Sequence, residues 1–174
     1  LQNDGYDTIV IQPTHISMGE EFLDLHTYVN ALMNMGTLKK AKYKPFYKVV
    51  LGRPVLGTYG VKHPYAEDIV TVAKVMAPDA ELAIKEKAGI IYMGHGNEYF
   101  PGNGGAYLEL ATRMRQMYPD VVTAIGNVEG YPAIEDVMET LKLYGVKKVV
   151  LKPFMVVAGD HSINDMASDE EDSW

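Results

Sequence analysis

The sequence predicts an α/β fold built from doubly wound parallel sheets, and three observations lead to this prediction. Short β-branched runs alternate along the chain with longer stretches of helical periodicity. The links between them are mostly short and contain Gly or Pro, and the whole alternation occurs twice in 174 residues. Strands that alternate with helices in this way favour parallel βαβ units. We therefore expect two successive α/β domains, in residues 1–85 and 86–174.

The first half is predicted to contain a strand, a helix, a strand and a helix, in residues 8–11, 18–35, 48–51 and 65–76. The strands are β-branched runs, which Gln12-Pro13 and Gly52 interrupt. The helices have apolar residues at intervals of three and four, and Gly36 is expected to end the first of them. The charged stretch 81–88 is expected to lead across the domain boundary.

The second half is predicted to alternate in the same way, with strands in residues 89–93, 121–125 and 148–157 and helices in residues 105–118 and 133–144. Its strands are again apolar or β-branched, and each runs into a segment that contains glycine. Gly145 is expected to end the last helix.

Composition and charge exclude several classes of protein. The chain has no cysteine, which excludes disulfide scaffolds, thiolate zinc sites, iron–sulfur clusters and cysteine nucleophiles. It carries 16 Lys and Arg against 23 Asp and Glu, and a net charge of −7 argues against a nucleic-acid partner. Its apolar runs are too short to span a bilayer, so no membrane partner is expected. Neither a phosphate-binding Gly-Lys-Ser/Thr motif nor a Gly-x-Ser-x-Gly elbow is present.

Polar residues at the strand ends are the candidates for chemistry. Ligands of open parallel sheets bind beyond the carboxyl ends of the strands. Those ends carry His15, Arg53, His95, Glu129 and His161, which include three of the five histidines. Arg53 could hold a substrate carboxylate, although ordinary surface arginines share this signal.

His95, Glu129 and His161 follow three successive strands of the second half. Glu129 lies 34 residues after His95 and 32 residues before His161, about one βαβ repeat each. This spacing is expected to bring the three side chains to one rim of the sheet. Two imidazoles and a carboxylate suit a divalent transition metal such as Co²⁺, Ni²⁺, Fe²⁺ or Zn²⁺, and three ligands leave coordination positions open. The alternative that these residues cap helices or hydrogen-bond to loops stays open at this point.

Three motifs around these residues resemble those of a known family. They are Tyr-Met-Gly-His-Gly at 92–96, Asn-Val-Glu-Gly-Tyr-Pro at 127–132 and the long stretch at 153–167, which contains Gly-Asp-His-Ser-Ile-Asn-Asp. In these motifs the chain resembles the anaerobic sirohydrochlorin cobaltochelatases, class II chelatases of the CbiK type that act in the early-cobalt-insertion route to cobalamin. Residues 12–16 and 19–22 resemble a segment of the family's first domain.

The resemblance implies two similar doubly wound, Rossmann-like domains with a cleft between them for a tetrapyrrole, sirohydrochlorin. It implies that His95, Glu129 and His161 take the metal-binding and catalytic positions, with Co²⁺ as the substrate metal and no organic cofactor. On this reading His15 and Arg53 are expected to receive carboxylates of the substrate. The family's opening strand and closing helices are not seen, so we expect residues 1–85 to be the C-terminal part of a first domain in a longer protein.

Two alternative functions stay open. A tetrapyrrole or metal carrier on the same fold would bind its ligand without turnover. A related chelatase could prefer Fe²⁺ or Ni²⁺, since nitrogen and oxygen ligands select weakly among these ions. By resemblance we also expect a homo-oligomer. The cytoplasm is the expected location of a biosynthetic enzyme, and a periplasmic location stays open because the lack of cysteine fits both compartments.

Overall fold

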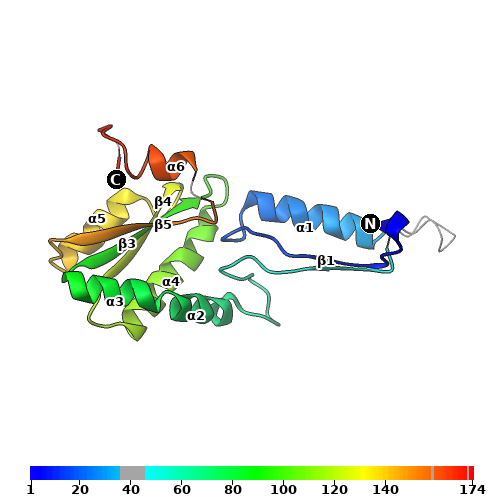
Figure 1. The fold of residues 1–174 in the computed structure, drawn as a ribbon, viewed down its shortest axis with the longest axis horizontal. Helices are drawn as coiled ribbons and strands as arrows, with labels where there is room; N and C mark the ends of the chain where they lie inside the picture. The colour runs from blue at the N-terminus through cyan, green and yellow to red at the C-terminus, as the bar shows by residue number, and fades with distance from the viewer. Residues whose placement is uncertain (36–45, 158, 172) are drawn as a thin grey trace.

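The computed structural model describes residues 1–35, 46–157, 159–171 and 173–174, and it contains two parallel sheets with flanking helices (Figure 1). In chain order the elements are η1 (Gln2–Asp4), β1 (Thr8–Ile11), α1 (Glu20–Met33), β2 (Lys48–Leu51), α2 (Tyr65–Val75), α3 (Ala77–Glu86), β3 (Gly89–Gly96), η3 (Pro101–Asn103), α4 (Gly104–Met117), β4 (Thr123–Glu129), α5 (Ile134–Leu143), β5 (Val149–Phe154) and α6 (Asp160–Ile163). This order confirms the α/β class with parallel strands. Among the described residues, no helix is both long enough and apolar enough to cross a bilayer.

The first sheet consists of β1 and β2, which pair in parallel with Thr8 opposite Lys48. The connection between them carries α1, which packs against β2. Phe22 and Val29, two turns apart on α1, are its buried residues, so one stripe of the helix faces the protein. The carboxyl ends of β1 and β2, and the segment that leads from β1 into α1, therefore face the second sheet.

The second sheet has the strand order β4-β3-β5, with every pair parallel. Side chains of β3 alternate between its two faces, because successive residues of a strand point in opposite directions. Ile90 and Tyr92 pack in a core with residues of α2, α3 and α4, whereas Ile91 packs with Val137 and Leu141 of α5. Helices therefore cover both faces of this sheet, and its middle strand is buried.

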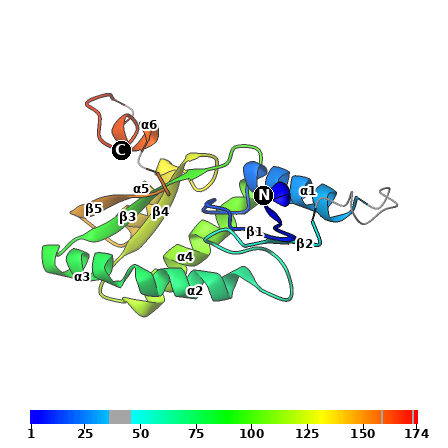
Figure 2. The same ribbon diagram turned by 45° about the vertical axis from the view of Figure 1, so that its right-hand side comes forward.

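The larger core lies between the second sheet and α2, α3 and α4. Ile69 and Ala73 of α2 and Leu110 of α4 are fully buried there beside Ile90. Complete burial of a large aliphatic side chain is worth about 1.5–3 kcal/mol. Figure 2 shows α2 running from the second sheet toward the first along the same side as α3. Residues on both sides of position 85 share this core, and the division into domains 1–85 and 86–174 stays a prediction.

The structure corrects several predicted elements. The stretch 81–88 is not a connection, because α3 occupies 77–86 and buries Ala80 and Ala83. The first two strands of the second half run further than predicted, to Gly96 and to Glu129, because their glycine-containing ends remain paired in the sheet. The last strand is shorter than 148–157 and ends at Phe154. Other helix limits differ by one or two residues, and the predicted stop at Gly36 lies outside the described residues.

Candidate metal centre

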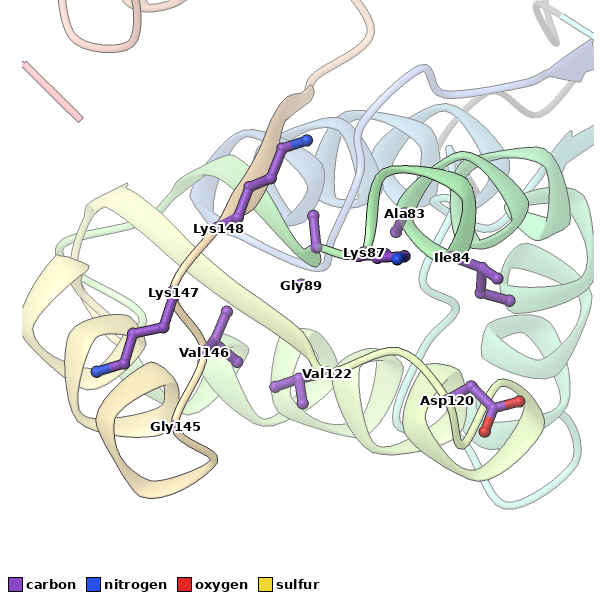
Figure 3. A pocket seen from close by; sticks show the side chains of 11 residues that line it. Ala83, Ile84, Lys87, Gly89, Asp120, Val122, Gly145, Val146, Lys147 and Lys148 are labelled. Atoms are coloured by element: carbon purple, nitrogen blue, oxygen red, sulfur yellow. The ribbon is translucent and has the colours of Figure 1, made fainter.

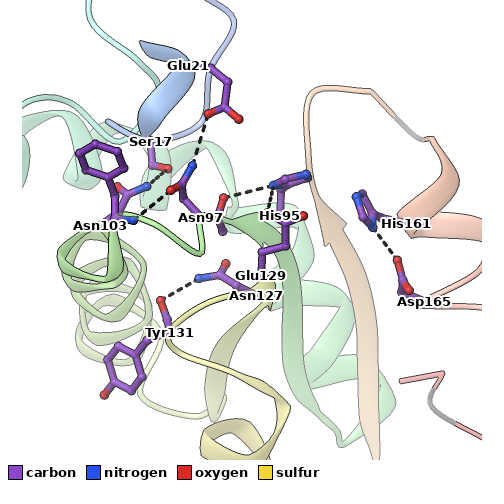
Figure 4. A network of polar contacts seen from close by, with 12 residues as sticks. Ser17, Glu21, His95, Asn97, Asn103, Asn127, Glu129, Tyr131, His161 and Asp165 are labelled. Carbon is purple, nitrogen blue, oxygen red and sulfur yellow. Dashed lines mark hydrogen bonds and ion pairs between the residues drawn. The ribbon is translucent and has the colours of Figure 1, made fainter. Parts of the chain in front are cut away.

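Three candidate ligands meet at the carboxyl edge of the second sheet (Figure 4). His95 lies near the end of β3, and Glu129 is the last residue of β4. The parallel ladder pairs Gly96 with Glu129 and so holds the two ligands at the same level. His161 lies in α6, which follows β5 on the other side of β3. Because β3 is the middle strand, ligands from both neighbours reach the histidine that it carries.

The three side chains offer ligand atoms that all lie within 4.8 Å of one another. The rings of His95 and His161 meet edge to face, with centroids 4.8 Å apart and planes at 86°. Nitrogen and oxygen ligands lie about 2.0–2.2 Å from a zinc-like ion, so two ligands of one ion are at most about 4 Å apart. The observed spacing is close to that of a ligand set around a single ion.

The Nδ1 atom of each imidazole also contacts a hydrogen-bond acceptor. Nδ1 of His95 is 3.1 Å from the carbonyl oxygen of Gly96, and Nδ1 of His161 is 2.6 Å from Oδ2 of Asp165. A carbonyl and a carboxylate only accept hydrogen bonds, so each Nδ1 carries the proton in these contacts. Nε2 is then the nitrogen with a free lone pair on both rings. A metal-binding histidine typically has this arrangement: one ring nitrogen binds the ion, and the N–H of the other donates to an acceptor that orients the ring.

The candidate ligands are also accessible. The side chains of His95, Glu129 and His161 are 44%, 45% and 34% exposed. A buried structural site would leave no room for another molecule, whereas this one is open on one side. Two imidazoles and one carboxylate can hold a divalent transition metal and leave coordination positions for water or a further ligand.

Two hollows adjoin His95, and both are formed by residues from the two halves of the chain. One, of about 230 Å³, lies between the segment before α1 and His95, and its lining includes Glu21 and Tyr107. The other, of about 210 Å³, is mostly apolar and lies between the same segment and the loop that joins β5 to α6, with Met155 and His161 in its lining. His95 and Ile16 line both, so the two hollows meet at the candidate metal centre.

Comparison with known families shows to which family the chain belongs. The family model described as "Cobalt chelatase (CbiK)" matches residues 1–174. The chain belongs to this family. Its sequence is 30% identical over 174 residues to the sirohydrochlorin cobaltochelatase of Salmonella typhimurium, a match that covers 100% of this chain and 58% of that protein. It is 28% identical over 169 residues to the sirohydrochlorin cobaltochelatase CbiKC of Nitratidesulfovibrio vulgaris, covering 97% and 53%. The chain thus spans little more than half the length of these cobalt chelatase relatives.

The two residues that were predicted to bind substrate carboxylates in this cobalt chelatase fold have different surroundings. His15 lines the 230 Å³ hollow together with His95, and its Nδ1 is buried with no hydrogen-bond partner among the described residues. Arg53 lines neither hollow and donates from Nε and Nη2 to the two carboxylate oxygens of Asp68, at 2.7 Å each. That pairing raises the pKa of Arg53 and lowers the pKa of Asp68. The structure therefore brings His15 to the site, while Arg53 is occupied by Asp68.

A buried polar cluster holds the two halves of the chain together beside the site. Asn103 donates from Nδ2 to Oγ of Ser17 at 2.7 Å, and the hydroxyl groups of Ser17 and Tyr107 are 3.2 Å apart. All three residues are buried. Burial raises the pKa of the Tyr107 phenol, so its hydroxyl keeps its proton and stays available for hydrogen bonding. The cluster fixes the segment before α1 against α4 and sets the width of the hollow next to His95.

A larger hollow, of about 520 Å³, lies at the opposite end of the second sheet (Figure 3). Its lining includes Gly89 at the start of β3, Val122 just before β4 and Lys148 just before β5. No histidine lines it, and Lys148 is paired there with Glu86. In a parallel sheet, ligands bind at the other, carboxyl ends of the strands. This hollow is therefore no part of the candidate metal centre.

Three residues beside the candidate site carried no assigned role in the sequence. Glu21 was quoted only as part of a family-like segment, although it stands in the first turn of α1 and lines a hollow. Tyr107 lies in a predicted helix with no polar signal to distinguish it. Asp165 appeared only as the last residue of the Gly-Asp-His-Ser-Ile-Asn-Asp motif. Its position four residues after His161 was a usable signal, because side chains at this spacing meet on a helical turn, and the two do so here although α6 ends at Ile163.

Proposed function

We propose that the protein is a sirohydrochlorin cobaltochelatase, which inserts Co²⁺ into the tetrapyrrole sirohydrochlorin during cobalamin biosynthesis. The observation that carries the proposal is the meeting of His95, Glu129 and His161 at the carboxyl edge of the sheet, within 4.8 Å of one another. Membership of the cobalt chelatase family and the names of two relatives support the same activity. On this proposal Co²⁺ is a substrate, and the three side chains hold it until the macrocycle takes it.

The ligand set suits the transfer of an ion. Hydrated Co²⁺ must lose water before pyrrole nitrogens can bind it. His95, Glu129 and His161 replace part of the hydration shell and leave positions open for incoming nitrogen ligands. Their partial exposure supports this role, because an ion that was fully enclosed could not be handed on. Ligation requires neutral imidazoles, so binding of Co²⁺ should weaken in mild acid.

The macrocycle is proposed to lie in a cleft between two α/β domains, and the two hollows beside His95 form its floor. The apolar lining of one hollow, from Ile16, Met155 and Val157, suits the faces of a tetrapyrrole ring. Peripheral carboxylates of the substrate need donors at the rim. His15 is in place for this, because it lines the hollow next to His95. Arg53 could contribute only if Asp68 releases it.

Insertion also requires proton transfer. Two pyrrole N–H protons leave the macrocycle as its four ring nitrogens bind Co²⁺, one to a group of the site and one to solvent water, so the total charge is conserved. Glu129, or the Nε2 atom of a histidine that releases the ion, can accept one of these protons within the same site. The proposal needs no organic cofactor. A homo-oligomer and a cytoplasmic location remain predictions that accompany it.

The test follows the absorption spectrum of sirohydrochlorin with Co²⁺ under anaerobic conditions. The natural full-length protein should accelerate insertion over the uncatalysed mixture, and H95A and H161A should remove the acceleration. H26A is the matched control, because His26 is exposed on α1 and, among the described residues, hydrogen-bonds to Asn30 of its own helix. Binding of the pigment without faster insertion would identify a carrier instead. Competition at controlled free concentrations would show whether Fe²⁺ or Ni²⁺ is preferred.

A further inference from the structure

In the candidate metal centre, different groups accept a hydrogen bond from the Nδ1 atoms of the two histidines. The partner of His95 is the carbonyl oxygen of Gly96, a neutral backbone atom at 3.1 Å. The partner of His161 is a carboxylate oxygen of Asp165, at 2.6 Å. Figure 4 shows Asp165 on the side of the His161 ring that faces away from His95. Charge-assisted hydrogen bonds are shorter and stronger than neutral ones, so the hydrogen bond that orients His161 is stronger than the one that orients His95.

His161 also has the greater need for such a partner. His95 and Glu129 lie in a paired ladder, where the neighbouring strand fixes the backbone. His161 lies in α6, which has only four residues and stands beyond the end of β5. A helix of one turn gives little rigidity by itself. Without another restraint, the His161 ring would be the least well placed of the three ligands.

The end of the described chain provides that restraint through Asp165. The backbone oxygen of Asp165 accepts hydrogen bonds from the N–H of Trp174 at 2.8 Å and from Oγ of Ser173 at 3.4 Å. The Trp174 side chain in turn packs against the small core on the α5 face of the sheet, which includes Val137 and Leu151. Asp165 is thereby tied to the body of the second sheet, and its carboxylate is presented to His161 from a fixed position.

We infer that Asp165 is a positioning residue for cobalt insertion, which fixes the tautomer and the orientation of His161 so that Nε2 faces the ion. This inference rests on the proposed function and deepens it, because it assigns a residue that acts on the metal only through His161. An ordinary helix-surface pair predicts something different. The two side chains are 34% and 37% exposed and four residues apart, and an ordinary surface pair of that kind would affect local stability alone. Metal affinity distinguishes the two roles.

The experiment is a titration of the natural full-length protein with Co²⁺ alone, with no tetrapyrrole present. Loss of an outer partner of a metal-binding histidine weakens binding or activity about 10- to 100-fold. D165N keeps an acceptor oxygen and removes the charge, so we expect a loss near 10-fold. D165A removes the acceptor as well, and we expect a loss near 100-fold. D160N is the matched control, since it removes the same charge five residues away, and the Asp160 carboxylate pairs with Asn164 rather than with His161.

Two further measurements distinguish a loss of metal binding from a loss of folding and identify the tautomer of His161. Thermal unfolding shows whether each variant is folded, and ¹⁵N chemical shifts of the imidazoles report the His161 tautomer in the unmodified protein. A proton on Nδ1 of His161, with graded losses in D165N and D165A and none in D160N, supports the inference. Equal Co²⁺ affinity in D165N, D165A and the parent protein would overturn it, as would a proton on Nε2. If the parent protein itself binds Co²⁺ no better than H161A, the proposed metal centre fails, and the role of Asp165 with it.

Discussion

Gly96 is the position where a single added methyl group should damage the candidate site most. It has a φ of +80°, and its Cα lies so close to β4 that an added Cβ would be 1.9 Å from the carbonyl oxygen of Glu129 and 2.5 Å from Cβ of Asn127. Ordinary contacts begin near 3.4 Å, so the G96A substitution requires Glu129 to move by about 1.5 Å. A displacement of about 1 Å at a reacting centre can cost about 100-fold in activity.

The cost to stability follows from the same geometry. A left-handed conformation at a residue with a side chain costs about 1–2 kcal/mol, and overpacking a close contact costs about 1–3 kcal/mol. We therefore expect G96A to lower the free energy of unfolding by about 2–5 kcal/mol and to weaken Co²⁺ binding at least 10-fold. The assays are denaturant unfolding and Co²⁺ titration below the unfolding transition. In the control G105A the new methyl group meets nothing within 4 Å, so stability should be unchanged or slightly raised. If G96A behaves like G105A, the close approach of β3 and β4 does not shape the site.

Two other changes test the packing around the site. D68N should lower stability by at most about 1 kcal/mol at neutral pH, because the bridge to Arg53 is partly exposed. The hydrogen bond from Arg53 lowers the pKa of Asp68 in the folded protein, so the contribution is complete above the ordinary aspartate pKa, about 4, and disappears as the pH falls through the lowered value. In urea unfolding, the difference between D68N and the parent should be full at pH 7 and smaller at pH 3, which lies below the ordinary aspartate pKa. Y107F removes a buried hydroxyl that meets Ser17 and should cost about 1 kcal/mol in thermal unfolding, and an unchanged melting temperature would contradict its place in the buried cluster.

The fold class and the central part of the site could be predicted because both depend on short-range patterns. Alternating strands and helices imply parallel sheets, and parallel strands bring residues about one βαβ repeat apart to the same edge. The meeting of His95 and Glu129 at one edge was predicted in this way, from strand ends alone, and their role as ligands stays a prediction. The ends of these strands were predicted too early, because they contain glycines that remain paired in the ladder. From sequence alone, a glycine that ends a strand cannot be distinguished from one that lets two strands approach closely.

The remaining features depend on contacts that no local pattern records. Helix α3 was missed because its buried residues include Ala80 and Ala83, which are too small to form an evident apolar stripe. The pairing of Arg53 with Asp68 depends on how the connection from β2 to α2 folds back. Asp165 was within reach of a spacing argument, but its importance comes from its contacts with both His161 and the Trp174 backbone.

The spacing of the three candidate ligands along the chain has a consequence for the unfolded protein. An unfolded chain would have to close two loops of just over 30 residues to gather His95, Glu129 and His161 around one ion. Closing each loop costs about 3–4 kcal/mol of chain entropy. The parallel strands of the folded protein have already closed both, so the unfolded chain should bind the ion far more weakly. A ligand with that preference raises the free energy of unfolding by about 2.7 kcal/mol at 100 times its dissociation constant. The melting temperature of this protein should therefore report how much of it carries metal.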